Sequence, residues 1–209
     1  MKVYTTEQAK ALAAQVDRAL PPQIRFYRYG DRTTQIIRFL IENDMVVAKT
    51  VTAIKQTALF RLYWHADEIT ISDVKDAFAK MEGFPTGVTE DGRIVWFLNC
   101  SFQTAVKIQD FMLASIYAVD DLQRRLYEEC QRRGIQEAYK DYCVIVADTA
   151  NVSYASLTTK MEKAGVDVFV RHFPSFMSVN DIFISDDTAF QPTYSWEHAT
   201  YYNLNTPFY

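Results

Sequence analysis

Glycine and proline are both scarce in this sequence, with six residues of each among 209. The glycines, at positions 30, 83, 87, 92, 134 and 165, are too widely spaced to form the glycine-rich loop that cradles a phosphate. No run of glycine or proline resembles a linker between domains. The scarcity excludes nucleotide binding by such loops. It also predicts one compact body, residues 1–187, followed by a C-terminal arm, residues 188–209.

Cysteine and histidine are also few, with three residues of each. Cys100, Cys130 and Cys143 are an odd number at wide spacings, which argues against a disulfide framework and for reduced thiols. The histidines have no partners at zinc-binding spacing, and no Gly-x-Ser-x-Gly nucleophile motif is present. We therefore expect no cofactor and no catalytic residue, and the balance is against an enzyme.

Long hydrophobic runs are absent. The longest charge-poor stretch, residues 94–106, is too short and too polar to cross a bilayer. The first residues lead directly into a helical pattern, without the apolar core of a secretion signal. We therefore expect a cytoplasmic protein, or one that is incorporated into a particle assembled inside the cell, with no membrane partner.

Lysine and arginine are absent from the last 38 residues, 172–209, which hold ten aromatic and four acidic residues. Without those four acids, the upstream part has 22 acidic and 22 basic residues, so the net charge of −4 lies in this segment. Phosphate backbones and anionic lipid headgroups repel such a segment. The expected partner is therefore protein, either this chain itself or a larger assembly, rather than nucleic acid.

The arm, residues 188–209, has seven aromatic residues and the alternation of an extended strand, with residues 194, 196, 198, 200 and 202 on one face. Ordering it costs on the order of 33 kcal/mol, and burying seven rings returns roughly 35 kcal/mol. The arm is therefore ordered only when its rings are covered. The covering surface is either its own core or another subunit. The predicted contact residues are Phe190, Tyr194, Trp196, Tyr201, Tyr202, Phe208 and Tyr209.

Helical spacing predicts two helices in the body. The first runs from Thr6 to Leu20 and is stopped by Pro21 and Pro22. The second is a long amphipathic helix over residues 104–133, or two helices joined at Asp120 and Asp121, ended by Gly134.

β-like runs predict strands in the rest of the body. A meander is expected over residues 23–54, in which residues 34–41 also fit a short helix. Two β-α-β units are expected at residues 58–98 and 142–171, and a further strand at 181–185. The predicted fold class is therefore α+β: a mixed or antiparallel sheet with helices packed on it, ferredoxin-like βαβ units, and an extended aromatic C-terminal arm.

Residues 59–112 are predicted as strand, helix, strand and helix, with the aromatic Phe60 in the first strand and Trp96 in the second. In this order the stretch resembles the RNA-recognition-motif family, in which aromatic residues on two central strands stack on bases. The resemblance implies RNA binding through Phe60 and Trp96. A plain ferredoxin-like unit with both rings buried accounts for the same residues.

Asp148 ends a predicted strand and is followed three residues later by Asn151. This pattern resembles the opening of PIN-type nucleases, which hold Mg²⁺ or Mn²⁺ with several carboxylates. The resemblance implies a metal site that combines Asp148 with Asp186 and Asp187. A role of Asp148 as a helix cap accounts for the same pattern.

The leading hypothesis is a non-enzymatic assembly subunit or protein-binding module, such as a phage or viral structural component, that uses the arm for protein contacts. The first alternative is a nucleic-acid protein, either an RNA binder or a metal-dependent nuclease. The second alternative is an inhibitor that binds a host protein.

Overall fold

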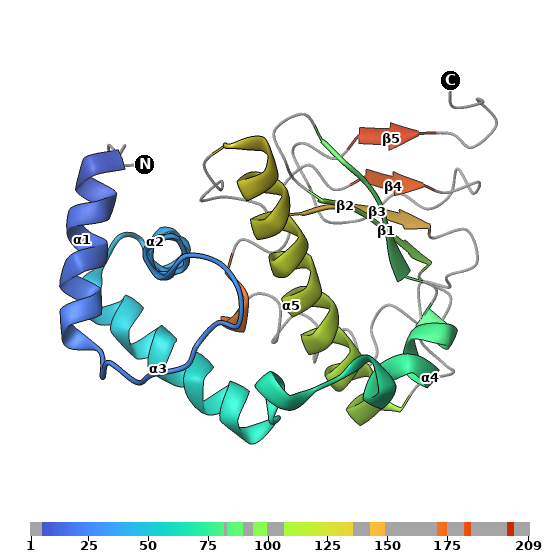
Figure 1. Ribbon diagram of the computed structural model, residues 1–209, viewed down its shortest axis with the longest axis horizontal. Helices are drawn as coiled ribbons and strands as arrows, with labels where there is room; N and C mark the ends of the chain where they lie inside the picture. Colours follow the sequence, from blue (N-terminus) through green and yellow to red (C-terminus); the bar gives the residue numbers. More distant parts are fainter. Residues whose placement is uncertain are drawn as a thin grey trace.

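The computed structural model describes residues 6–81, 83–89, 94–99, 107–135, 143–148, 171–174, 182–184 and 200–202. This part of the chain is mostly helical, with five α-helices and one 3-10 turn. Three helices lie at one end of the molecule and the strands lie at the other, with the long helix α5 (Ile108–Arg133) between them (Figure 1).

Helices α1 (Thr6–Ala19), α2 (Arg32–Glu42) and α3 (Val47–Tyr63) pack on one another at the N-terminal end. α2 begins after Asp31, whose side chain accepts a hydrogen bond from the backbone N–H of Thr34 at 2.8 Å. The three helices bury one hydrophobic cluster. Its large aliphatic members that are almost completely buried are Val16, Ile36, Ile37, Leu40 and Ile54.

A turn after α3 leads to the 3-10 turn η1 (Ala66–Glu68) and to α4 (Ile71–Met81). The backbone N–H and hydroxyl of Thr70 donate to the Asp73 carboxylate at 2.8 and 2.7 Å and fix the start of α4. α4 packs along α5. α5 ends at Gly134, which has a φ of 65°, in the left-handed region that favours glycine.

The strands β1 (Gly83–Val88), β2 (Ile94–Asn99), β3 (Cys143–Asp148), β4 (Ile182–Ile184) and β5 (Thr200–Tyr202) are neighbours in this order. β1 and β2 are antiparallel. β2 and β3 are parallel over six residue pairs, and α5 is the crossover between them. β4 and β5 extend the sheet by parallel ladders of three residue pairs each, so β5 is the last described strand on its side.

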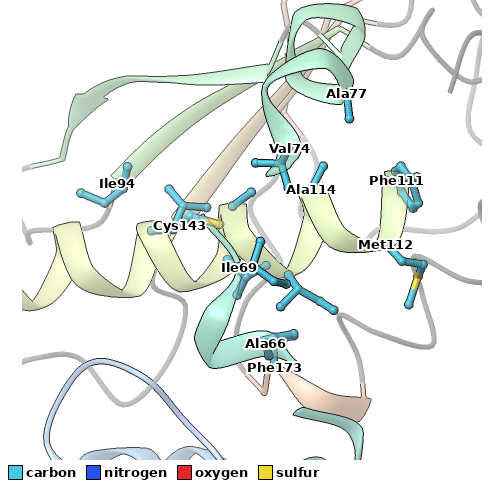
Figure 2. Packing of buried hydrophobic residues seen from close by; sticks show 14 of the residues in the cluster. Ala66, Ile69, Val74, Ala77, Ile94, Phe111, Met112, Ala114, Cys143 and Phe173 are labelled. Atoms are coloured by element: carbon cyan, nitrogen blue, oxygen red, sulfur yellow. The ribbon is translucent and has the colours of Figure 1, made fainter. Parts of the chain in front are cut away.

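A second hydrophobic cluster surrounds α5 (Figure 2). Ile94 of β2 and Cys143 of β3 contribute from the sheet, and Val74 and Ala77 contribute from α4. Phe173, in the short segment 171–174, also belongs to it. The largest share comes from α5 itself: Phe111, Met112, Ala114, Ile116, Ala118, Val119, Leu122, Leu126 and Cys130. α5 is therefore the central packing element of the C-terminal half.

The predicted fold class is wrong. The strands predicted at 45–54 and 58–64 lie mostly in helix α3, and residues 34–41, for which a short helix was the alternative to a strand, lie in helix α2. The described part contains no ferredoxin-like antiparallel sheet, because the first strand of the predicted unit is a helix and β2 to β5 pair in parallel. β-branched residues such as Ile36 and Ile37 fit the periodicity of a strand as well as that of a helix. The cap at Asp31 and the packing of the helices on one another stabilise the helix.

Several single elements are confirmed although their arrangement differs. The helix predicted from Thr6 to Leu20 is α1, and the helix predicted at 104–133 is α5. The strands predicted around residues 94–98, 142–146 and 181–185 are β2, β3 and β4. The helix predicted within residues 142–171 lies outside the described residues.

Candidate protein-binding surface

The C-terminal end of α3 is a sharp turn at Trp64 and His65. The backbone N–H of Trp64 donates to the carbonyl of Phe60 at 3.1 Å, and that of His65 donates to the carbonyl of Leu62 at 3.2 Å. His65 has a φ of 50° and a ψ of 40°, a left-handed conformation that is uncommon for a residue with a Cβ atom. The turn lies beside the beginning of α5.

A groove of about 590 Å³ lies between these two helix ends. Tyr63 and Trp64 meet edge to face, with ring centroids 5.4 Å apart and an interplanar angle of 85°. Trp64 is half-buried and packs on the second hydrophobic cluster, as does Leu113 from the other wall. The lining residues are Tyr63, Trp64, His65, Ile108, Gln109, Met112 and Leu113. The groove is therefore mainly aromatic and aliphatic, with His65 and Gln109 as its polar groups.

The outer side of α3 continues this apolar surface. Leu59 is 67% exposed, Leu62 is 72% exposed and Tyr63 is 77% exposed. Residues three and four apart lie on neighbouring turns, so these three side chains form one patch. α3 contains no acidic residue, and its exposed cations are Lys49 and Lys55. We call the surface formed by Lys55, Leu59, Leu62 and Tyr63 the α3 face.

A second hollow, of about 460 Å³, follows the N-terminal half of the same helix. It is lined by Asn43, Ala48, Lys49, Thr52, Ala53 and Gln56. Lys49 is paired there with Asp44 at 3.2 Å, whereas Lys55 has no ion-pair partner among the described residues. The outer side of α3 thus has a hollow near each end and carries one cation without a counterion among the described residues.

A buried ion cluster joins α3 to α5 behind the α3 face. Both guanidinium ends of Arg61 donate to Asp120, at 3.0 and 2.8 Å, and Arg61 also donates to Asp67 at 2.5 Å. The side chains of Arg61 and Asp120 are each 2% exposed. Burial raises the pKa of the Asp120 carboxyl, and the hydrogen bonds from Arg61 oppose this shift. Because Arg61 engages both oxygens of Asp120, the cluster fixes the spacing of α3 and α5.

A polar hollow of about 280 Å³ lies beside this cluster. Arg28 is at its wall and donates to the carbonyl of Ile69 at 3.3 Å. Asp121 pairs with Arg124 and Arg125 at 2.6 Å each. Each charged group that lines this hollow, Arg28, Asp120, Asp121 and Arg124, therefore has a hydrogen-bond or ion-pair partner.

Phe60 and Trp96 are not brought together as the RNA-recognition resemblance implies. Phe60 lies in helix α3, half-buried, and stacks on the His172 ring with centroids 4.1 Å apart. His172 Nδ1 lies 3.2 Å from the hydroxyl of Thr57. Trp96 lies in β2, opposite Pro85 and Ile145. The predicted pair of aromatic residues on neighbouring strands is wrong, because residue 60 is helical.

Asp148 is the last residue of β3, at the strand end that the sequence predicted. Asp186 and Asp187 lie outside the described residues, so the predicted metal site stays a prediction. Within the part that the structure describes, no three potential metal ligands among His, Cys, Asp and Glu converge.

Two of the predicted arm residues, Tyr201 and Tyr202, lie in β5 and pair with Phe183 and Ile184 of β4. The backbone of this short piece of the arm therefore belongs to its own sheet. The other five contact residues, Phe190, Tyr194, Trp196, Phe208 and Tyr209, lie outside the described residues.

None of the described helices is both long enough and apolar enough to cross a bilayer. No protein-family model matches the chain, and no curated protein is significantly similar to it in sequence. The surface chemistry of the described residues is therefore the basis for a function.

The prediction missed the α3 face because residues 58–64 were interpreted as a strand. In a strand, Leu59 and Leu62 lie on opposite sides, whereas in a helix they share a side. The sequence held one usable signal. α3 is the only α-helix of the described chain without an acidic residue, so its solvent side lacks the mixed charges of an ordinary exposed helix.

Proposed function

We propose that this chain is a non-enzymatic protein-binding module that serves as an assembly subunit, and that the α3 face is a contact surface for protein. The observation that carries the proposal is the joint exposure of Leu59, Leu62 and Tyr63 beside an apolar groove. Scattered exposed apolar residues are normal, but contiguous ones mark interaction sites. A partner that covers this patch gains about 25 cal/mol for each Å² of apolar surface removed from water.

The extent of the surface favours a protein over a small molecule. Small ligands are held in pockets that enclose most of their surface. Here Leu59 and Leu62 are outside the groove, and the second hollow continues along the same helix. An elongated surface with one aromatic recess suits a polypeptide segment that inserts a side chain and lies along the helix.

The aromatic arm, residues 188–209, is the second proposed contact, through Phe190, Tyr194, Trp196, Tyr201, Tyr202, Phe208 and Tyr209. Its composition supports this role, because aromatic residues are enriched where proteins meet. A subunit of a phage or viral particle is the kind of assembly component that we propose. A cytoplasmic place of assembly is part of the same proposal.

The proposal is tested by placing a photo-crosslinking amino acid at position 62 of the full-length protein in the cells that produce it. Illumination should give a covalent protein adduct, identified by mass spectrometry. The matched control places the same amino acid at position 132, on the exposed and charged end of α5, where few adducts are expected.

Two results would contradict the proposal. The first is the absence of protein adducts at position 62 beyond those at position 132. The second is an adduct of a small apolar molecule at position 62 without a protein adduct, which would make the groove a small-molecule site.

A further inference from the structure

We infer that the α3 face binds the acidic aromatic C-terminal segment, residues 186–209, of a second copy of this chain. The inference rests on the proposed function and names the partner of the same surface. Such a contact gives a closed pair when two copies make it reciprocally, and a ring or an open chain when it runs head to tail.

Charge complementarity is the first argument. α3 carries Lys49 and Lys55 and no acid, and Lys55 has no ion-pair partner among the described residues. The last 38 residues of the chain contain four acids and neither lysine nor arginine. Three of these acids, Asp186, Asp187 and Glu197, lie in the proposed segment. Opposite charges on the two surfaces favour this pairing and disfavour contact of two α3 faces, whose lysines repel.

Apolar complementarity is the second argument. The groove at the end of α3 is bounded by Tyr63, Trp64 and Met112. Aromatic rings pack well against other rings and against methionine sulfur. The segment has seven aromatic residues in 22 positions from residue 188 on, and its one tryptophan, Trp196, has the largest ring. We therefore assign Trp196 to the groove.

The arrangement of the elements is the third argument. β5, which holds residues 200–202 of the segment, is at the sheet end of the molecule (Figure 1). The helices α1 to α3 are at the opposite end, with α5 between the two. Residues 200–202 are therefore at the opposite end of the molecule from the α3 face of their own chain, which favours a neighbouring copy as the source of that face.

The test uses two full-length variants, each with one half of the contact removed. Leu59→Glu/Leu62→Glu removes the face and keeps the segment, whereas Trp196→Ala changes the segment and keeps the face. Leu59 and Leu62 are exposed, so the face variant should melt at the temperature of the wild type. Ile135→Glu, at an exposed isoleucine beyond the end of α5, is the matched control.

Sedimentation velocity of the purified proteins should show concentration-dependent oligomers for the wild type and for Ile135→Glu. Each of the other two variants should self-associate at least about tenfold more weakly, as expected for a residue at the centre of an interface. A mixture of the two should form dimers that grow no further, because only one intact face and one intact segment are left. The milder Leu62→Gln should give an intermediate weakening.

Several results would overturn the inference. A wild type that is monomeric at every concentration excludes the second copy as partner. A mixture of the two variants that stays monomeric also contradicts the inference, because the intact face of one variant should bind the intact segment of the other. Undiminished association of Trp196→Ala removes the segment from the contact. If the chain is monomeric but position 62 cross-links to a different protein, the inference fails and the proposed function stands.

Discussion

The two longest helices of the described chain, α3 and α5, present different surfaces to solvent. On α5, arginines and acids pair three or four residues apart: Arg124 with Glu128, Arg125 with Asp121, and Arg132 and Arg133 with Glu129. On α3, the solvent side has exposed leucines and a tyrosine, two lysines and no acid.

The two helices differ in how their solvent-facing side chains are satisfied. The arginines of α5 pair with acids of the same helix, and its apolar side is buried under α4 and the sheet. α3 buries Thr50, Ile54, Thr57 and Arg61 on its inner side but still exposes apolar groups on its outer side. The difference supports the proposed contact function of α3 and a structural role of α5.

The largest expected effect comes from breaking the buried link between the two helices. Arg61→Met leaves the Asp120 carboxylate buried without its guanidinium partner, so we expect the free energy of unfolding to fall by about 3–5 kcal/mol. Urea titration measures the change.

The double variant Arg61→Met/Asp120→Leu is the control, because it removes both charges. It should recover much of the lost stability, since a buried ion pair replaced by apolar groups is often nearly neutral. A single variant as stable as the wild type would show that Arg61 does not hold α3 against α5.

The next effect separates the inner from the outer side of α3. Ile54 is fully buried, and Ile54→Ala should destabilise the protein by about 2–5 kcal/mol through the cavity that it leaves. Leu59→Ala on the outer side should change stability by no more than about 0.5 kcal/mol. Thermal unfolding of both variants measures the contrast. Equal losses would mean that Leu59 is part of a core.

A smaller effect on stability is expected from substitutions at the C-terminal ends of α5 and α3. α5 ends at Gly134 with a φ of 65°, and a Cβ atom added there would touch nothing within 4 Å. Gly134→Ala should therefore cost about 1 kcal/mol, from backbone strain alone.

α3 is followed by His65, which has a φ of 50° and no glycine to relieve it. His65→Gly should leave stability unchanged or slightly higher while weakening binding in the groove that His65 lines. Calorimetry and the cross-linking yield at position 62 measure the two effects. A clear loss of stability in His65→Gly would assign this residue to folding rather than to the groove.

The smallest effect is the pH dependence of the α5 surface. Hydrogen bonds from Arg132 and Arg133 lower the pKa of Glu129 from its ordinary 4.5 to about 2. A lowered carboxyl pKa stabilises the folded state above pH 4.5, and this contribution is lost as the pH falls towards about 2. Glu129→Gln should thus be slightly less stable than the wild type at neutral pH and equal to it near pH 2. Added salt should shrink the difference, because the pairs are at the surface.

Sequence patterns were most informative where the apolar spacing fitted only one kind of secondary structure. α1 and α5 could be predicted because their apolar residues recur at helical spacing and are followed by Pro21 and Gly134. α2 and α3 could not, because runs such as Thr34–Ile41 fit a strand as well as a helix. The candidate surface could not be predicted either, because Leu59 and Leu62 form a patch only when residues 58–64 are helical.

The sequence alone determined the position of the acidic aromatic C-terminal segment, the lack of glycine-rich phosphate loops, and the strongest helices and strands, because each depends on local composition or spacing. The tertiary structure decided that α3 is a helix, which of its sides is buried, and that its end faces the beginning of α5. Those features depend on the Arg61–Asp120 link and on packing between residues far apart in the chain. Local propensity is too weak to fix them, because burial of a helix side is a property of its neighbours.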